Sequence, residues 1–408
     1  MRVNTSLSKA FDASFERLIA SFAVEQGLLP DEASLSSRRF VARSLVPHIK
    51  KLSSKFNRAE DEDRSKALDP YWKETGNREN LRLAYFLYFM PANLYRVASV
   101  WGELHRLGFR WGAQGPLRAI EFGAGPAAGA SGVAAGERYT PLGMPSEGDW
   151  ALIEQDRASL ELGTAWAERY FADAGNPGWG TRPFHRKIEL SKGLLPRTAP
   201  KFNLWVMSFF LNELSESPGE IADALLAAWE KHLDEEGIVV LVEPALKPIS
   251  RKLLELRKAL LQPARLKRAP WLRVLLPCLG HQACGALAGA EDWCHEEVTW
   301  WRPPYYRKLD DLAGLDRKTL PFSYLVIARS RRAAGALLPE LSGAHSLHRL
   351  VSPAHAEGRD QEFFLCGQDG KLRARFRGED LERGDVLENA EIRGNEKSAR
   401  VERIGKRR

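Results

Sequence analysis

Four cysteines are the residues whose type and spacing point most directly to chemistry. They are the only cysteines in 408 residues; three of them, Cys278, Cys284 and Cys294, fall within 17 positions, and Cys366 follows after 71 intervening residues. Four thiolates suit a tetrahedral zinc site or an iron–sulfur cluster. Zinc sites usually contain cysteine pairs separated by about two to four residues, and no such pair is present. The spacing therefore favours a [4Fe–4S] cluster, with zinc as the alternative.

Two histidines, His281 and His295, are reserve ligands or hydrogen-bond donors to sulfur in this hypothesis. The competing interpretation is four unrelated core cysteines, because free cysteine is often buried. If Cys366 does join the other three, the metal centre would fasten the C-terminal part of the chain to the preceding domain, and metal loss would unfold that junction.

A glycine-rich loop, RAIEFGAGPAAGASG, follows the first strand-like run. Gly123 and Gly125 allow a tight turn and a close approach of a ligand to the backbone. Glu121 precedes the loop, and Glu154 ends the next predicted strand, where its carboxylate can accept hydrogen bonds from ribose hydroxyls. Because Glu154 lies farther from the glycines than an NAD fingerprint prefers, the pattern favours S-adenosylmethionine (SAM) over NAD. An ordinary strand-to-helix turn is the structural alternative, and Ala127 stands where a third glycine usually falls.

A second polar pair, Asn212 and Glu213, directly follows the apolar run FNLWVMSFFL. Ligands of doubly wound folds bind at the carboxyl edge of the sheet, so these residues are also candidates for the SAM site. The alternative is a helix N-cap with a charge in its first turn. No catalytic residue can be assigned, because no Asn-Pro-Pro-Tyr type motif is present and no cysteine lies close to the ligand loops.

Basic residues are clustered in a chain with net charge +7 and pI near 9.2. The clusters span residues 33–59, residues 246–274 and the C-terminal tail, and such clustering is typical of a polyanion binder. Solvated helix faces are the plainer interpretation. The candidate RNA-binding residues are Arg38, Arg39, Arg43, Lys50, Lys51, Arg251, Lys252, Lys267 and Arg268.

The segment EEVTWWRPPYYRK interleaves aromatic residues with Arg302, Arg307 and Lys308. Its aromatic side chains are able to stack on unpaired bases, or Trp300 and Trp301 pack in the core. The first 25 residues lack the apolar run of a secretory signal, and no apolar stretch is long enough for a membrane span. We therefore expect an intracellular protein that does not enter membranes.

The elements that must position these residues form three predicted regions. Residues 1–115 are a helical N-terminal region, including a helix at 81–107 with Pro91 at a start or kink. Residues 116–335 alternate strands and helices, as in an α/β domain with a parallel sheet, and include a basic, cysteine-containing insertion at about 246–310. The predicted strands lie in the apolar runs 117–123, 150–156, where the strand ends at Glu154, 202–209, 237–244 and 322–329, with helices at 157–171 and 219–233. Residues 340–408 are a small, barrel-like β domain with a basic tail, and its Gly367-Gln368-Asp369-Gly370 loop indicates a hairpin.

Taken together, these segments resemble the methyltransferase-like assembly factors of the small ribosomal subunit, which occur in mitochondria and as bacterial relatives. The resemblance extends from LAYFLYFMPANLYRVASV through EFGAGPAAG, LIEQD, SFFLNELSE, LVEPAL and DWCHEE to FSYLVIAR. It implies a class I SAM-dependent methyltransferase (Rossmann-like) fold, small-subunit rRNA as partner, and a [4Fe–4S] cluster on Cys278, Cys284, Cys294 and Cys366. It also implies that Glu121, Gly123, Gly125 and Glu154 line SAM, with Asn212 and Glu213 near its methionine end. Departures from the family pattern are Ala127, Leu279 and Gly285.

The sequence thus predicts a SAM-dependent methyltransferase that acts on rRNA, monomeric away from the ribosome. Its expected compartment is the cytoplasm of a bacterium, or the mitochondrial matrix of a eukaryote. A non-catalytic assembly factor on the same fold is the main alternative. An NAD(P)-dependent redox enzyme that uses the cluster as an electron relay is a further one.

Overall fold

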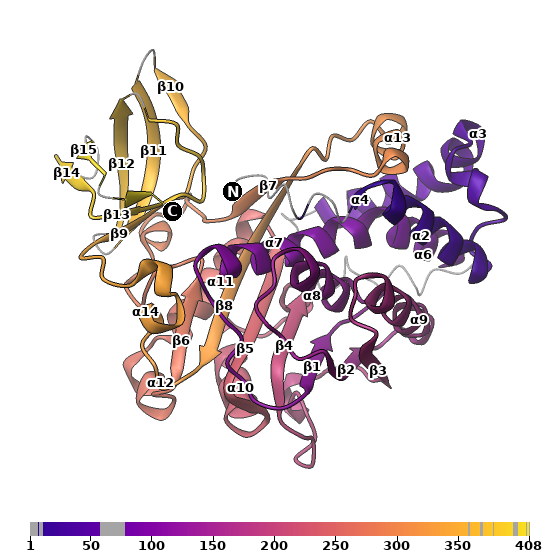
Figure 1. The fold of residues 1–408 in the computed structure, drawn as a ribbon, viewed down its shortest axis with the longest axis horizontal. Coiled ribbons are helices and arrows are strands. Elements are labelled where there is room, and N and C mark those ends of the chain that lie inside the picture. The colour runs from indigo at the N-terminus through magenta and orange to yellow at the C-terminus, as the bar shows by residue number, and fades with distance from the viewer. Residues whose placement is uncertain are drawn as a thin grey trace.

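The computed structural model describes residues 7, 11–57, 78–357, 360–367, 370–377, 379–394, 399–404 and 406–407. Figure 1 shows an α/β body with helices at its N-terminal end and a separate sheet formed by the C-terminal residues. Among the helices in these ranges, none has both the length and the apolar character that crossing a membrane requires.

The central sheet has the strand order β3-β2-β1-β4-β5-β8-β6, and β7 pairs with β8 outside this path. Strands β1 to β5 pair in parallel, whereas β8 runs antiparallel between β5 and β6. This order, with one reversed strand in that place, is that of class I methyltransferases, so the predicted fold class is confirmed. The strands are β1 (Leu117–Phe122), β2 (Glu147–Glu154), β3 (Gly178–His185), β4 (Phe202–Ser208), β5 (Leu233–Pro244), β6 (Leu272–Leu276), β7 (Glu296–Thr299) and β8 (Thr319–Arg329).

Alternating side chains of the strands face two separate cores, as the two-residue period of a strand requires. In β4, Leu204 and Val206 join the core that includes the N-terminal helices, whereas Trp205 and Met207 join the core on the opposite face. The first face is covered by the N-terminal region with α8 (Ala128–Tyr139) and α9 (Arg157–Asp173). The second is covered by α10 (Pro218–His232), α11 (Lys247–Leu260) and α12 (Pro263–Arg268).

Helix α7 (Met90–Arg106) joins the N-terminal region to the sheet domain and is buried from Met90 to Leu104. It packs closely on α8, where a Cβ on Gly136 would lie 2.5 Å from the Trp101 side chain. Pro91 is in the first turn of α7, as predicted, because proline is tolerated there. The remaining elements of this region are α2 (Ala13–Glu25), η2 (Glu32–Leu35), α3 (Arg38–Phe40), η3 (Val41–Leu45), α4 (Val46–Asn57), α6 (Arg78–Ala84) and η5 (Tyr85–Phe89).

The C-terminal residues form a curled second sheet with the order β14-β15-β12-β11-β9-β13-β16 and with β10 paired to β11. The predicted hairpin is present, since Gly367 pairs with Gly370 between β11 and β12; Gln368 and Asp369 lie outside the described residues. Strands β13 and β14 are separate because Asn389, between them, has a left-handed backbone, with φ 53°. The strands are β9 (Leu347–Leu350), β10 (His355–Glu357), β11 (Asp360–Gly367), β12 (Gly370–Arg377), β13 (Val386–Glu388), β14 (Glu391–Arg393), β15 (Ala399–Arg403) and β16 (Lys406–Arg407).

Short helices connect these parts of the molecule. They are η6 (Leu190–Lys192), η7 (Leu211–Glu213), η8 (Gly285–Leu287), α13 (Pro304–Ala313), α14 (Ala334–Leu337) and η9 (Pro339–Leu341). Strands β3, β6 and β7 were not anticipated from the sequence. The domain boundaries at 115/116 and between 335 and 340 stay predictions; β1 begins at Leu117 and β9 at Leu347.

Candidate functional site

The glycine loop lies between β1 and α8 at the carboxyl edge of the sheet. Gly123 and Gly125 have φ of 63° and 49°, values that favour glycine, and Ala127 has the same left-handed geometry with φ 56° and ψ 44°. A Cβ on Gly123 would lie 3.0 Å from the Phe210 ring. The loop is therefore shaped as a tight turn, and its third left-handed position is occupied by alanine at a cost in backbone energy.

Glu121 lies behind this loop rather than at its surface. Its side chain is 1% exposed and accepts hydrogen bonds from the backbone N–H groups of Gly129 (2.9 Å) and Ala130 (2.8 Å) in the first turn of α8. Burial raises the pKa of Glu121 to about 8, although the two amides oppose this shift. The described contacts give Glu121 the role of holding the N-terminus of α8 against β1.

Glu154 ends β2 and faces the glycine loop. Its Oε2 accepts from Gly125 N (2.9 Å), and its Oε1 accepts from Gln155 N (2.7 Å) and Asp156 N (2.9 Å). Burial raises the pKa of Glu154, and the three amides act in the opposite direction. The carboxylate therefore holds the loop in place, and unused lone pairs remain on its oxygens for a ligand hydroxyl.

Asn212 and Glu213 lie in η7, directly after β4. The alternative that they cap a helix is not supported, because α10 begins after Ser217, which forms a capping box with Glu220. Glu213 is exposed, whereas Asn212 is half-buried and its Oδ1 has no hydrogen-bond partner among the described residues. Phe209, at the turn between β4 and η7, has φ 60°, so the chain is strained where it leaves the sheet.

Glu243, at the carboxyl end of β5, is a site residue that the sequence argument missed. It is 1% exposed, its Oε1 accepts from Leu211 N (2.7 Å), and no described residue hydrogen-bonds its Oε2. It shares a small pocket with Asn212 and Lys252. Burial raises the pKa of Glu243 to about 8. Its place after an apolar strand, GIVVLVEP, was the available signal.

Polar residues of the N-terminal region also approach this edge and were missed. Tyr85 lies close enough to Glu213 and Glu154 for their charges, after burial, to raise its pKa. Asn93 Oδ1 accepts from Arg96 Nη1 at 2.7 Å, and the Arg96 guanidinium lies 5.5 Å from the centre of the Phe209 ring. Burial lowers the pKa of Arg96 to about 9. The N-terminal region thus supplies polar groups beside the carboxyl ends of β2 and β4.

The four cysteines approach one another although Cys366 is far away in sequence. Cys278, Cys294 and Cys366 line one cavity of about 40 Å³, which exceeds the space that one water needs. Burial raises the pKa of all three thiols, that of Cys366 to about 12, and the nearby Cys284 thiol adds to the rise at each. A Cβ on the next residue, Gly285, would lie 2.6 Å from the backbone N of Lys371, the residue paired with Cys366.

No group of three or more His, Cys, Asp or Glu side chains among the described residues is arranged to hold a metal ion. His281 Nε2 accepts a hydrogen bond from Val274 N at 3.2 Å, and the His295 ring lies 5.9 Å from that of Trp293. His295 and Gln282 line the cysteine cavity.

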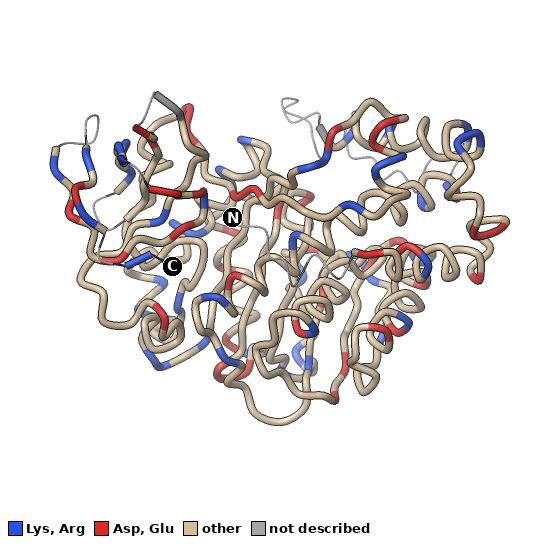
Figure 2. Tube along the Cα trace, turned by 45° about the horizontal axis from the view of Figure 1, so that its top comes forward, with Lys and Arg blue, Asp and Glu red and all other residues tan. Residues whose placement is uncertain are grey.

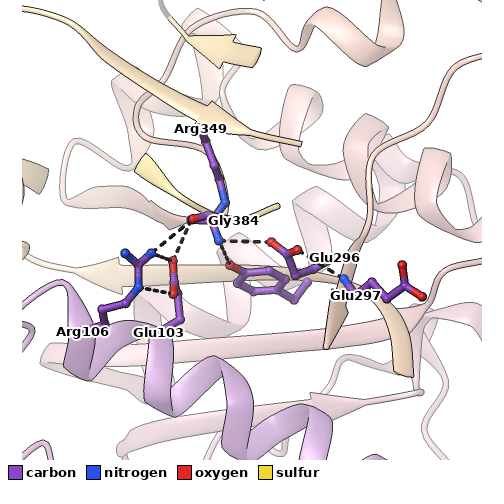
Figure 3. A network of polar contacts seen from close by, with 7 residues as sticks. Glu103, Arg106, Glu296, Glu297, Arg349 and Gly384 are labelled. Atoms are coloured by element: carbon purple, nitrogen blue, oxygen red, sulfur yellow. Dashed lines mark hydrogen bonds and ion pairs between the residues drawn. The ribbon is translucent and has the colours of Figure 1, made fainter. Parts of the chain in front are cut away.

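A buried ion-pair network forms one wall of the cysteine cavity. Figure 3 shows Arg349 of β9 between Glu103 of α7, which accepts from Nη1 at 2.8 Å, and Glu296 of β7, which accepts from Nη2 at 3.1 Å. Arg349 also pairs across the sheet with Cys366 and donates to Tyr324 Oη at 3.3 Å. The network therefore joins the C-terminal sheet, α7 and the central sheet beside the four thiols.

The candidate RNA-binding residues fall into two groups. Arg38, Arg39, Arg43, Lys50 and Lys51 are all exposed on α3, η3 and α4, and Figure 2 marks the Lys and Arg positions along the backbone at this end of the molecule. Lys267 and Arg268 are exposed on α12.

Arg251 and Lys252 lie in different surroundings. Arg251 donates to the backbone carbonyls of Ala286, Gly289 and Asp292, and Lys252 donates to the carbonyl of Leu214. Both side chains are half-buried, so their charges help to order the cysteine segment and the loop after η7. Any role of theirs in binding RNA stays a prediction.

Comparison with solved structures gives methyltransferases of low similarity. A precorrin-6y C5,15-methyltransferase from Geobacter metallireducens GS-15 is 16% identical, covering 57% of this chain and 88% of that chain with a TM-score of 0.29. An arsenic(III) S-adenosylmethionine methyltransferase from Chlamydomonas reinhardtii is 17% identical, covering 65% and 83% with a TM-score of 0.28. An O-methyltransferase from Bacillus cereus in complex with SAH is 8% identical, covering 58% and 81% with a TM-score of 0.30. Because these TM-scores are low, the fold class is assigned from the strand order.

Comparison with curated proteins gave no match. A family model described as mitochondrial small ribosomal subunit Rsm22 matches residues 80–392. The matched range begins in α6 and ends in β14, so it includes the glycine loop and all four cysteines. The resemblance inferred from the sequence is thereby confirmed. This chain belongs to the Rsm22 family of the mitochondrial small ribosomal subunit.

Proposed function

We propose that this protein binds SAM on its methyltransferase fold and acts on small-subunit rRNA during ribosome assembly, with a [4Fe–4S] cluster on its four cysteines. The observation that carries the SAM part is the gathering of Gly123, Gly125, Glu154 and Asn212 at the carboxyl edge of β1, β2 and β4. Ligands of open α/β sheets bind at this edge. Membership of a family named for the mitochondrial small ribosomal subunit supports the ribosomal part.

SAM, when bound, supplies an electrophilic methyl group. Glu154 would accept hydrogen bonds from its ribose hydroxyls, and the backbone of the glycine loop would approach it closely. Asn212 Oδ1, a half-buried acceptor with no described partner, suits an ammonium donor such as that of the methionine end. Of the cofactors weighed from the sequence, NAD fits less well, because a dinucleotide fingerprint places its acid nearer to the glycines.

The cluster is supported by three thiols, those of Cys278, Cys294 and Cys366, that line one cavity, with the Cys284 thiol near them. The sulfur ligands of a single zinc ion lie about 2.3 Å from the metal and therefore close to one another. The thiolates of a cubane cluster stand farther apart, and the sequence lacks the close cysteine pairs that zinc sites usually contain. Arg257, Arg349 and Lys371 place positive charge near the thiols, which favours the anionic ligands that a cluster needs.

Titration of the protein with SAM and with NADH tests which cofactor it binds. The variant Gly123→Arg is the control and should lose SAM binding, because its side chain would enter the glycine loop beside Phe210. Transfer of label from SAM to immature small subunits tests catalysis. SAM binding with label transfer that is lost in Gly123→Arg supports the enzyme. The absence of SAM binding would overturn the SAM part of the proposal.

A non-catalytic rRNA-binding assembly factor is the second candidate. Two observations favour it: Ala127 holds a strained left-handed backbone in the glycine loop, and the segment after β4 supplies Phe209, Phe210 and Asn212 without an assignable catalytic base. SAM binding with no transfer to any subunit state would support this candidate. The protein should occupy the compartment of the ribosome that it helps to assemble. For the family as named this is the mitochondrial matrix, and for a bacterial member it is the cytoplasm.

A further inference from the structure

Two neighbouring tryptophans between β7 and α13, Trp300 and Trp301, have opposite surroundings. Trp300 is 5% exposed, donates from its indole N–H to the carbonyl of Arg317 at 2.7 Å, and packs against Phe11 and Tyr306. Trp301 is 55% exposed, more than any other large apolar side chain among the described residues. The core therefore accounts for Trp300, whereas more than half of the Trp301 side chain is exposed to water.

The position of Trp301 is fixed by its neighbours. The preceding Trp300 is buried, and the following Arg302 donates to the fully buried Asp310 at 2.6 Å. Pro303 and Pro304 then begin the helix, which restricts the backbone further. A ring held on such a segment loses little conformational entropy when it binds a partner.

A guanidinium group lies beside this ring. Arg307, one turn into α13, is exposed, and its Cζ is 5.7 Å from the centre of the Trp301 ring, within the range of a cation–π contact. An aromatic face with an adjacent cation is the combination with which proteins bind an unpaired nucleotide, since the ring stacks on the base and the cation attracts the phosphate.

Helix α13 is part of the same surface as the basic N-terminal helices. It packs against α4 and η3. Lys308 Nζ donates to the carbonyl of Ser36 at 2.8 Å, which lies just before the exposed Arg38 and Arg39. Figures 1 and 2 show α13 beside α3 and α4 at one end of the molecule. A chain with a net charge of +7 presents here a cluster of exposed cations beside one exposed indole.

We propose that Trp301 and Arg307 form a stacking platform for an unpaired RNA base, whose flanking phosphates lie on the basic residues of α3, η3 and α4. This inference rests on the proposed RNA-binding function and makes it more specific, because it assigns the surface to single-stranded rather than duplex RNA. Arg38, Arg39 and Arg43 supply the charge, and the indole supplies the preference for an exposed base.

The test compares the affinity of the full chain for a single-stranded oligonucleotide and for a duplex of the same length. Stacking contributes about 1–3 kcal/mol per base, so Trp301→Ala should weaken single-strand binding by about 5- to 150-fold and duplex binding by less than about 2-fold. Trp301→Phe keeps an aromatic face and should retain most of the affinity. Phe184→Ala removes another exposed ring, 49% exposed on β3, and should change neither affinity. Thermal unfolding of each variant verifies that the fold is intact.

The outcomes separate this inference from the function on which it rests. If the unsubstituted protein binds neither RNA, the proposed RNA function fails. If it binds single strands and Trp301→Ala binds them equally well, the RNA function stands and the platform is overturned. If Trp301→Ala instead loses a ribosomal protein partner while single-strand affinity is unchanged, the surface is a protein interface and the platform is likewise overturned.

Discussion

Arg349 and Glu103 form a buried ion pair between segments that are 246 residues apart in sequence. Their side chains are 3% and 1% exposed, and the Nη1 to Oε1 distance is 2.8 Å. Burial acts to raise the pKa of Glu103, but Arg106 and Arg349 together lower it to about 2. The pair is therefore ionised at neutral pH and fastens the C-terminal sheet to α7.

The substitution Glu103→Gln should destabilise the protein by about 3 kcal/mol or more, because it leaves the buried Arg349 guanidinium without its full counter-charge. The loss should be smaller at low pH, since the stability that Glu103 contributes is present above its unfolded pKa of about 4.5 and disappears as the pH falls toward 2. Chemical denaturation at pH 7 and pH 4 measures both effects. Arg182→Ala breaks an exposed pair with Asp149 and should cost less than about 1 kcal/mol. Equal losses in the two variants would contradict this account of the junction.

Ala127 offers a test of strain in the glycine loop. An alanine in the left-handed region costs about 1–2 kcal/mol in backbone strain, and Ala127→Gly relieves this strain. The same substitution removes a buried methyl group and increases the backbone entropy of the unfolded chain, and these two losses of stability approximately offset the relief. We expect Ala127→Gly to change the free energy of unfolding by less than about 0.5 kcal/mol. Ala128→Gly, one residue later in the right-handed first turn of α8, should cost about 1–2 kcal/mol. Denaturant midpoints at unchanged m-value measure the contrast, and similar losses in both variants would rule out strain at Ala127.

Glu243 should make stability depend on pH in the direction opposite to Glu103. Its folded pKa of about 8 is above its unfolded value of 4.5, so the folded state keeps the proton longer. The protonated carboxyl makes its full contribution to the free energy of unfolding below about pH 4.5. This contribution, at most about 5 kcal/mol, is lost as the pH rises to about 8. Glu243→Gln should therefore gain stability relative to the unsubstituted protein over this window. Parallel denaturation series at pH 5, 7 and 9 check the sign, and a difference that is constant with pH would refute the assignment.

The cysteine centre predicts a link between metal and the C-terminal sheet. Purified protein should be brown, with a broad visible absorbance that bleaches on reduction and about four iron atoms per chain. Cys366→Ser should lower iron content and also increase hydrogen exchange in β9, β11 and β12, because the ligand is in β11. Ser352→Ala, a buried position in the same region that does not line the cavity, is the control for iron content. Zinc in place of iron, in a colourless protein prepared without oxygen, would favour the alternative metal.

The central strands were predictable because each is a short apolar run in the sequence. Runs such as WALIEQD are apolar and end in an acid, so the end of β2 at Glu154 follows from the sequence itself. Strand β3 escaped prediction because it is an edge strand with mostly exposed side chains and an internal proline, Pro183. Strands β6 and β7 are only five and four residues long, too short for a pattern to emerge.

The candidate site was predictable only where its residues follow a strand. Glu121 and Asn212 could be placed at the sheet edge in this way. Arg96 could not, because it reaches the edge through the packing of α7, which no local pattern encodes. Arg251 shows the reverse: it looks like a surface charge in the sequence, yet it is half-buried and binds three carbonyls of the cysteine segment.

The final prediction concerns RNA binding by the basic surface of the N-terminal helices. If Arg38, Arg39 and Arg43 contact phosphates, changing all three to Glu should weaken RNA binding strongly and reduce the slope of log affinity against log salt by about two to three. A charge-matched control changes the exposed Arg157, Arg182 and Lys192, which lie on α9, β3 and η6, to Glu. This control has the same net charge, so it separates local contacts from the overall field of the protein. Filter binding between about 50 and 300 mM salt measures the slopes. Equal slopes for the two triple variants would show that the N-terminal helices make no phosphate contacts, and the RNA would then have to bind elsewhere on the molecule.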